Sequence, residues 1–471
     1  MAVIKKAKPA HPAVKWMNAK PARLIVLSFL LVILIGAVLL AMPFASQDRR
    51  SVGILNALFT ATSATCVTGL VVVDTATHWS SFGKGVILSL IQIGGLGLVT
   101  ITSFFYSLIR RKAKLRTMVV AQESTANFSF TDVFRLVRRI VLITLTIELI
   151  GGIILTWRFM GEMKPFKAFT RGFFQSVSAF CNAGVDLHGD TFAGPYSSLT
   201  AWNHDPVVVV ITALLFIIGG LGFVVWSDLL RWRRESRLNF HTKLVLTMSG
   251  VLIIFGFIYF LIAEFDNTRS AFSMGSLPVW QRPFAAFFQS VTPRTAGFNT
   301  IDQASLHDSS KFMTVIMMFI GAAPGSTGGG VKITTFAVML ATIFSDIRGF
   351  DDIIIMRHKI ARETFTRALA IVGLGLTIIL SVTIILSVIE RKALDSNTFS
   401  FLDILFESSS AFGTVGLSAI GTPNLTPTSH AILIPVMYLG RVGPASFAIS
   451  LAMQKASKRE LVRPEGKTLV G

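Results

Sequence analysis

The hydrophobic positions of this chain gather into long runs that carry almost no charge. Several runs exceed the roughly 20 residues that an α-helix needs to cross the hydrocarbon core of a bilayer. They form four pairs along the chain. The first run of each pair is predicted at about 24–43, 140–160, 244–263 and 368–389, and the second at about 85–109, 206–230, 312–344 and 430–453. The pattern predicts an all-α membrane protein with eight transmembrane spans.

A segment too short to cross the membrane lies between the two runs of each pair. These segments cover about 54–68, 168–183, 283–296 and 402–415. Each contains a phenylalanine that precedes a glycine by nine or ten residues; the phenylalanines are Phe59, Phe174, Phe288 and Phe406. About eleven helical residues extend roughly 17 Å, around half the hydrocarbon thickness, so such a helix can only enter the membrane and return. Backbone of this kind is tolerated at membrane depth where protein buries it or water lines it.

The glycines that end these segments recur at a nearly constant spacing. Gly69, Gly184, Gly297 and Gly416 are separated by 115, 113 and 119 residues, so one supersecondary unit is used four times. The predicted units are 24–110, 135–232, 243–345 and 366–454, here called repeats 1 to 4, between a basic N-terminus at 1–23 and a C-terminal segment at 455–471. Four such units around one axis predict a single pore with pseudo-four-fold symmetry.

The backbone around each glycine is a candidate cation site. A half-length helix that enters from outside points the negative end of its dipole at the membrane centre. The extended residues after it can replace the water shell of an ion with carbonyl oxygens, and glycine frees the backbone for this. The predicted filter residues are Val67, Thr68, Gly69, Asn182, Ala183, Gly184, Thr295, Ala296, Gly297, Thr414, Val415 and Gly416. Thr-Val-Gly in repeat 4 also opens the potassium-channel signature Thr-Val-Gly-Tyr-Gly.

Composition supports the membrane assignment, and charge sets the orientation. The chain is 52% hydrophobic and 15% charged, with a mean hydropathy of +0.65 and a net charge of +19. Of its 44 lysines and arginines, 29 lie in the segments 1–23, 110–139, 231–243, 345–367 and 455–467, each of which follows an even number of spans. The positive-inside rule therefore predicts a multi-pass protein of the cell membrane with both termini in the cytoplasm. Topology and anionic lipid explain the basic charge without a nucleic-acid partner.

The second run of repeat 3 is interrupted. Pro324 and five glycines among residues 321–330 cannot sustain a helix, so this stretch must line water or be buried by protein. Arg441, in the last run, is costly near mid-membrane unless it faces water or partners. Facing the pore it would repel cations; alternatively, it only bonds free carbonyls of the broken helix. The predicted gate residues are Gly321, Pro324, Gly325, Gly328, Gly329, Gly330, Lys332 and Arg441.

Other polar residues within the membrane are weaker candidates. Glu148 is predicted either to function as an ionisable group or to pair with a neighbouring helix. Glu407 is predicted to brace its short helix, and Asp186, just after the glycine of repeat 2, to concentrate cations at the pore mouth. Cys66 and Cys181 lack metal-ligand spacing and are predicted to be buried thiols.

These residues together resemble the Trk/Ktr/HKT superfamily of potassium transporters, most closely the KtrB-type membrane subunits of bacterial Ktr systems. The resemblance covers about residues 20–455, with one filter glycine in each repeat. It implies potassium uptake through a four-loop filter, gated by the interrupted segment of repeat 3 and by Arg441. It also implies a homodimer in the lipid bilayer on a cytosolic ring of nucleotide-binding KtrA-type regulatory subunits.

Two alternatives stay open at this stage. One is a sodium-selective or sodium-coupled cation symporter, because the four glycines do not exclude Na⁺ as a coupling or activating ion. The other, of a different class, is an intramembrane enzyme, although Glu148 has no second catalytic group beside it in the sequence. The leading prediction is a transporter of K⁺ with no organic cofactor and no metal beyond the transported cation.

Overall fold

The computed structural model describes residues 21–97, 130–235, 237–350 and 352–443. Most of the predicted N-terminal segment, the whole C-terminal segment and the far ends of the runs at 85–109 and 430–453 lie outside these residues. The charged stretch 110–129, which contributes to the predicted orientation, also lies outside them.

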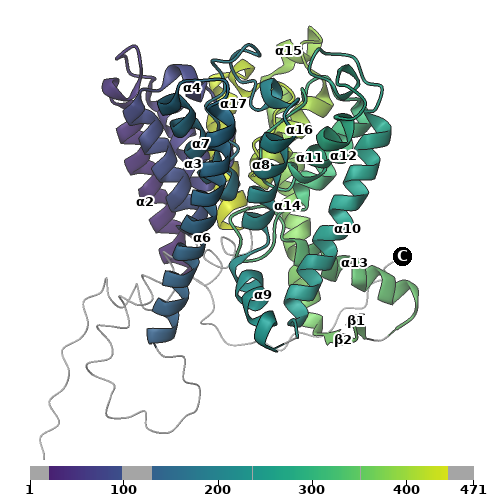
Figure 1. Cartoon of the computed structure of the whole chain (residues 1–471). Helices are drawn as coiled ribbons and strands as arrows, with labels where there is room; N and C mark the ends of the chain where they lie inside the picture. The colour runs from purple at the N-terminus through teal and green to yellow at the C-terminus, as the bar shows by residue number, and fades with distance from the viewer. Residues whose placement is uncertain (1–20, 98–129, 236, 351, 444–471) are drawn as a thin grey trace, which may run out of the picture.

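Most of the described residues are helical, and irregular segments with one short hairpin connect the helices (Figure 1). The first runs form α2 (Pro21–Ala41), α6 (Phe130–Phe159), α10 (Phe240–Ala263) and α14 (Arg362–Ile389). The short segments form α3 (Ile54–Cys66), α7 (Pro165–Phe180), α11 (Arg282–Val291) and α16 (Phe401–Gly413). The second runs form the helix Ser81–Gly97, α8 (Pro206–Gly220) with α9 (Phe223–Glu235), α12 (Asp308–Phe319) with α13 (Ile333–Ile347), and α17 (Pro427–Val442). Connecting elements are η1 (Pro43–Ala45), α4 (Thr75–His78), η2 (Thr200–Trp202), η3 (Met274–Ser276), β1 (Ile353–Ile355), β2 (His358–Ile360), α15 (Arg391–Asp395) and η4 (Thr422–Asn424).

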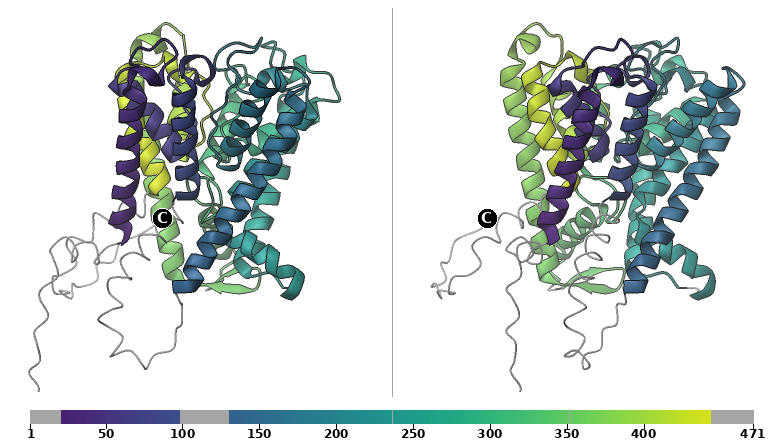
Figure 2. Two further views of the ribbon diagram at one scale, coloured as in Figure 1. Left: turned by 60° about the vertical axis from the view of Figure 1, so that its left-hand side comes forward. Right: turned by 90° about the vertical axis from the view of Figure 1, so that its left-hand side faces the viewer.

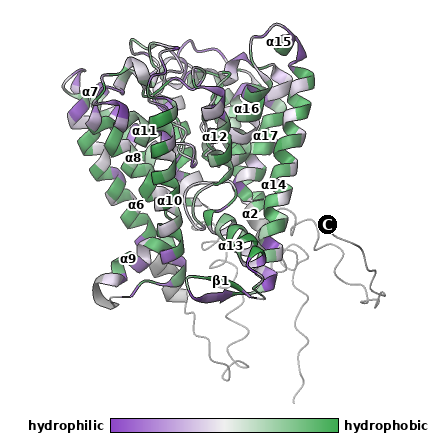
Figure 3. Ribbon diagram, turned by 90° about the vertical axis from the view of Figure 1, so that its right-hand side faces the viewer, coloured by the Kyte–Doolittle hydropathy of each residue, from purple (hydrophilic) through white to green (hydrophobic). Residues whose placement is uncertain are grey.

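The long helices have the length and composition of membrane spans. Among the described residues, Val137–Phe159, Phe240–Ala263 and Arg362–Ile389 can each cross a bilayer, and the bent pair α8–α9 makes a fourth if it is one span. Hydrophobic residues cover the middle of the long helices, while hydrophilic residues gather toward the two ends of the molecule (Figure 3). This distribution matches an all-α membrane protein. The number of eight spans stays a prediction.

The four short helices lie in the upper half of the molecule, enclosed by the long ones (Figures 1 and 2). Each packs against the first long helix of its own repeat: α3 on α2, α7 on α6, α11 on α10 and α16 on α14. Their phenylalanines Phe59, Phe174, Phe288 and Phe406 are all buried. The segments that sequence pattern predicted to be half-length helices are therefore found within a few residues of the expected bounds.

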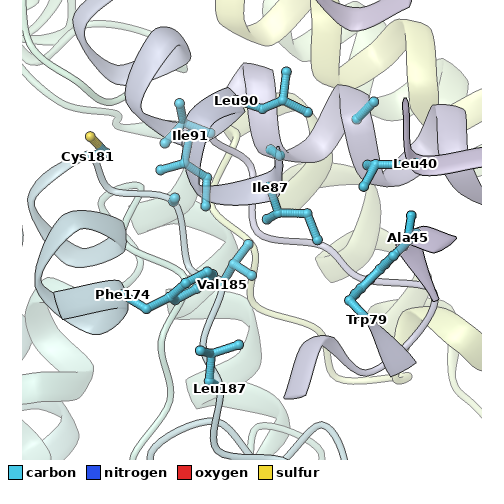
Figure 4. Close-up of a cluster of buried hydrophobic side chains, with 14 of the residues drawn as sticks. Leu40, Ala45, Trp79, Ile87, Leu90, Ile91, Phe174, Cys181, Val185 and Leu187 are labelled. Atoms are coloured by element: carbon cyan, nitrogen blue, oxygen red, sulfur yellow. The ribbon is translucent and has the colours of Figure 1, made fainter. Parts of the chain in front are cut away.

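Contacts between repeats join neighbouring units. Repeats 1 and 2 share a cluster of buried side chains in which Ile87 and Ile91 meet Phe174 and Val185 (Figure 4). Repeats 2 and 3 meet through α8 and α11, and repeats 3 and 4 through α12 and α16. The circle is completed where α17 packs on α3 of repeat 1.

Two features differ from the sequence-based prediction. The run at 206–230 was expected to be one span, but it bends by 97° between α8 and α9. Gly222 at the bend has φ +91°, and the N–H of Phe223 bonds to Gly325 of repeat 3 rather than continuing the α8 ladder. The all-α prediction also omitted the antiparallel hairpin β1–β2. Its turn residues, Met356 and Arg357, have positive φ. Neither is a residue that usually occupies a type I′ turn, so the sequence contained no turn motif that would predict the hairpin.

Candidate functional site

The four repeat glycines lie against one another in a closed ring. A Cβ atom at Gly184 would come within 2.9 Å of the Cα of Gly297 and 3.1 Å of the carbonyl oxygen of Ala296. The same relation holds around the ring: the carbonyl oxygens of Ala183, Ala296, Val415 and Thr68 occupy the space that a side chain would need at Gly69, Gly184, Gly297 and Gly416, respectively. Each glycine thus makes room for the carbonyl that precedes the glycine of the next repeat.

The backbone around the ring has an unusual and repeated conformation. All four glycines have positive φ, at +89°, +63°, +80° and +97°. The residue two positions before each glycine is also left-handed, with φ +57° at Val67, +60° at Asn182, +70° at Thr295 and +51° at Thr414. Successive carbonyls of an extended strand point to opposite sides, so inverting every second residue turns them toward the same side. Left-handed β-branched residues are strained, and strain repeated at equivalent positions points to a functional constraint.

The C-terminal ends of the short helices anchor the extended segments that carry the ring glycines, here called strands. α3 and α16 end directly before the left-handed residues Val67 and Thr414. The N–H groups of Thr68, Ala183 and Val415 bond to carbonyls five residues earlier at 2.8, 2.8 and 2.9 Å, as in a Schellman cap. Side-chain hydroxyls add a second restraint. Ser63 accepts from the N–H of Gly69 at 3.1 Å, and Ser410 accepts from that of Gly416 at 3.0 Å. In repeats 2 and 3 the corresponding hydroxyls of Ser178 and Thr292 donate to Val185 and Phe298.

We expect Ser410→Ala to loosen the repeat 4 strand without unfolding the protein. The change removes one hydrogen bond worth about 1 kcal/mol, so potassium-over-sodium selectivity should fall by roughly fivefold. Competition between the two ions for uptake into liposomes measures this ratio. The matched control is Ser408→Ala, because within the described part of the chain the Ser408 hydroxyl bonds only to the carbonyl of Ile404 in the same helix. Equal selectivity in the two variants would contradict a restraining role for Ser410.

The interrupted segment of repeat 3 lies directly beneath the ring. It leaves α12 after Phe319, returns at Ile333, and is closed at its neck by a 2.8 Å bond from the N–H of Gly321 to Val331. Side chains of the left-handed residues contact this interrupted segment. The Thr295 and Thr414 hydroxyls occupy the space that a side chain would need at Gly328 and Gly329, respectively. Thr327 in turn donates to Asn182 at 3.0 Å, so repeats 2, 3 and 4 all contact the loop.

Two cationic side chains hold this loop by its carbonyl groups. Arg441 is buried and donates one bond to the carbonyl of Thr327 and another, of 2.6 Å, to that of Gly94 in repeat 1. The Lys332 ammonium donates to the carbonyl of Gly328 at 2.7 Å. In the part of the chain that the structure describes, no carboxylate forms an ion pair with Arg441. The predicted gate residues are thus brought together, and the arginine links the loop to the second helix of repeat 1.

The glycines of the second runs pack against the ends of the short helices. A side chain at Gly94, Gly219 or Gly440 would collide with the backbone carbonyl of Thr65, Phe180 or Phe412, respectively, each four residues before a ring glycine. These glycines therefore permit close helix contact. Gly321, at the corresponding position of repeat 3, instead packs against Gly329 of the interrupted segment.

A polar cavity of about 290 Å³ opens on the other side of the ring and is lined by all four glycines. Three carboxylates from three repeats face it: Asp74, Asp186 and Asp302. Burial raises the pKa of Asp186 to about 6, so this group loses its charge as the pH falls through that value. Sequence reasoning singled out Asp186 but missed the other two. Both lie five residues after a ring glycine, and this shared offset could have revealed them.

We expect Asp302→Asn to lower cation entry at low ionic strength by about twofold to threefold, because the mouth loses part of its attraction for cations. Uptake rates measured at low and high salt test this. The difference should vanish at high salt, where the charges are screened. Asp395→Asn, at an exposed carboxylate outside the cavity, is the control and should leave the rate unchanged. A loss that persists at high salt would contradict an electrostatic role.

The remaining intramembrane acids have structural partners. Glu407 accepts bonds of 2.6 Å from Ser418 and from Thr422, so it braces the strand that follows Gly416. Glu148 accepts from Gln92 of repeat 1 at 3.2 Å and lies beside the Cys181 thiol, which agrees with its pairing to a neighbouring helix. Among the described residues, no group of three or more His, Cys, Asp and Glu side chains could hold a metal ion.

Comparison with known proteins connects this arrangement to a family. The model of the TrkH family, described as cation transport proteins, matches residues 7–460. The chain belongs to the TrkH family. The resemblance recognised from the sequence is thereby confirmed. As a member of the TrkH family the protein is a membrane cation transporter and not an enzyme, which removes the intramembrane-enzyme alternative.

Relatives within the TrkH family cover nearly the whole chain. Ktr system potassium uptake protein B of Bacillus subtilis is 36% identical over 97% of this chain and 98% of its own length. The protein of the same name from Vibrio alginolyticus is 37% identical over 95% of this chain and 94% of its own. Potassium/sodium uptake protein NtpJ of Enterococcus hirae is 36% identical over 93% and 94%. The crystal structure of the potassium transporter TrkH from Vibrio parahaemolyticus matches with a TM-score of 0.64 at 17% identity, covering 90% of this chain and 84% of that one.

Proposed function

We propose that this TrkH-family protein takes up potassium through a filter formed by the carbonyl oxygens around the four ring glycines. The single observation that supports this most directly is the ring itself, in which residues far apart in sequence meet with the same left-handed backbone. Relatives named as potassium uptake proteins over almost the full length point to the same ion. The proposed filter comprises the three residues that end at each ring glycine, from repeats 1 to 4 of a protein with eight spans.

The electrostatics of the ring favour a cation. The four short helices end at the ring, so the negative ends of their dipoles face it. The three carboxylates of the outer cavity add negative charge on the entry side. A membrane potential of 100 mV contributes about 2.3 kcal/mol per monovalent cation, enough for roughly fifty-fold accumulation. Uptake driven by the membrane potential therefore needs no catalytic group in this chain.

The segment 321–330, Lys332 and Arg441 form the proposed gate. The loop contacts side chains of three of the four proposed filter segments. The cationic side chains of Lys332 and Arg441 donate hydrogen bonds to its carbonyls. We infer that a partner must displace it, and the naming of the relatives as parts of a Ktr system favours a multi-component assembly. The proposed assembly is a homodimer with cytoplasmic termini on a cytosolic ring of nucleotide-binding KtrA-type subunits.

Ion flux in a defined membrane tests this proposal. The purified full-length chain is reconstituted in liposomes, and influx of potassium, rubidium and sodium is measured with and without a regulatory ring. We expect potassium and rubidium to enter well ahead of sodium. Sodium influx equal to or above that of potassium would favour the sodium-coupled alternative. The absence of selective cation flux under either condition would contradict the proposed function.

A further inference from the structure

A groove unrelated to the ion path opens between repeats 1 and 2. It has a volume of about 380 Å³ and lies between the helix Ser81–Gly97 and the first half of α7. Its polar lining includes three cationic side chains, Lys84, Lys167 and Arg171, and one carboxylate, Asp190. These four side chains leave an excess of two positive charges at the end of the molecule that carries the pore mouth.

Among the lining residues, Asp190 is the carboxylate that pairs with the cationic side chains, while Asp74 and Asp186 act electrostatically on Lys84 and Arg171 from outside the lining. Lys167 contacts Asp190 with a distance of 2.7 Å between Nζ and Oδ2, and Arg171 binds the other oxygen of the same carboxylate. One carboxylate therefore serves two cations. The Lys84 ammonium donates to the backbone carbonyl of Ala76 at 2.6 Å. A phosphate group entering the groove would meet three cationic donors and a single competing acid.

Aromatic side chains form much of the remaining lining of the groove. Phe166 and Phe169 at its rim are 80% and 50% exposed, so they offer apolar surface to the surrounding lipid. The Phe169 ring lies 4.5 Å from that of Phe173, between ring centroids. Phe174 and Leu187 close the inner wall, beside the strand that carries Val185 (Figure 4).

A second groove continues from the first along the membrane-facing side of repeat 1. It is apolar, has a volume of about 520 Å³, and runs between α2 and the helix Ser81–Gly97, past Leu39, Ile35 and Val32. Gly85 lines both grooves. No atom of the described residues lies within 4 Å of the position that a Cβ atom would occupy there, so the missing side chain leaves the passage between them open.

We propose that the two grooves together bind one anionic glycerophospholipid. Its phosphate lies among Lys84, Lys167 and Arg171, and one acyl chain passes Gly85 into the apolar groove. A soluble anion would occupy only the first groove. Because the apolar groove continues from it, a lipid with an anionic headgroup fits both grooves together. The site does not depend on the proposed potassium function.

Native mass spectrometry of the purified full-length protein tests the site, with phosphatidylglycerol, phosphatidylcholine or inorganic phosphate added. We expect bound phosphatidylglycerol, less phosphatidylcholine, and no displacement by phosphate. The double variant Lys84→Gln/Lys167→Gln should weaken phosphatidylglycerol binding by roughly thirty-fold, at about fivefold for each charge near an anionic lipid surface. Lys164→Gln is the matched control, since this exposed lysine lies three residues from Lys167 but does not line the groove.

Gly85→Leu tests the passage between the two grooves. It changes no charge, and its result does not depend on whether the double variant folds. Leucine is a better helix former than glycine and enters open space here, so the fold should persist while lipid binding falls. Gly250→Leu in α10, where the space is equally open, should retain the lipid. Equal retention of the two phospholipids, displacement by phosphate, or full binding by Gly85→Leu would each overturn the proposal. Displacement by phosphate would assign the cationic groove to a free anion.

Discussion

Gly416→Ser is expected to abolish selective potassium flux, with a loss of at least about tenfold. Two independent costs act at this residue. Its φ of +97° is strained for any residue with a side chain, by roughly 1–3 kcal/mol. In addition, a Cβ atom would collide with the carbonyl oxygen of Thr68 and lie 2.9 Å from the Cα of Gly69. Both obstacles are backbone atoms, which cannot rotate away, so the ring must deform between repeats 4 and 1.

Potassium, rubidium and sodium influx into liposomes measures the effect. Gly373→Ser is the matched control: this glycine lies in α14 of the same repeat, and no atom of the described residues comes within 4 Å of a Cβ atom there. The control should transport as the parent protein does. Unchanged selectivity in Gly416→Ser would show that Gly416 is not part of the filter.

Arg441→Ala is expected to raise basal flux by more than about tenfold when no regulatory partner is present. The change leaves the carbonyls of Thr327 and Gly94 without their donor, so the loop loses its link to repeat 1. It also removes a fixed positive charge. At an effective dielectric constant of about 20, such a charge some 6 Å from a cation raises the energy of that cation by roughly 3 kcal/mol. Both effects act in the same direction.

Arg441→Lys separates the two effects, since lysine keeps the charge but a single ammonium cannot reproduce the guanidinium fork. We expect the lysine variant to conduct more than the parent and less than the alanine variant. If basal flux in Arg441→Lys is as high as in Arg441→Ala, the hydrogen bonds of Arg441 alone restrain the loop. Arg391→Ala, which removes a highly exposed arginine, serves as the control. If basal flux in Arg441→Ala equals that of the parent, the gate lies elsewhere.

Much of the architecture could be predicted from the sequence because the membrane limits the choices. Long apolar runs can only be helices at that depth, and half-length segments such as 402–415 can only re-enter. The period of the glycines revealed the repeat, and Pro324 with its neighbouring glycines revealed the broken helix. These signals are local or periodic, so they can be read without knowledge of the tertiary structure.

What escaped prediction depends on contacts between repeats. The bend after α8 involves a bond from Phe223 to Gly325, about a hundred residues away, so the local Gly222 does not predict it by itself. The left-handed conformation of Val67 is disfavoured by its own side chain, so propensity argues against it. The hydrogen bonds of Arg441 to two separate repeats likewise required the structure. The sequence singled out Arg441 and favoured a gating role for it over simple bonding to the free carbonyls of the broken helix, and the two roles were compatible.

The ring is formed by one polypeptide, so the residues that each repeat contributes to it are encoded separately. Immediately before the ring glycines stand threonine, alanine, alanine and valine, and two positions before them stand valine, asparagine, threonine and threonine. A channel built from four identical subunits changes all four positions with one codon, whereas here one codon changes one. With the ring as the proposed filter, ion preference could therefore be adjusted one repeat at a time, by mutagenesis or by natural divergence, while the other three repeats keep their original sequence.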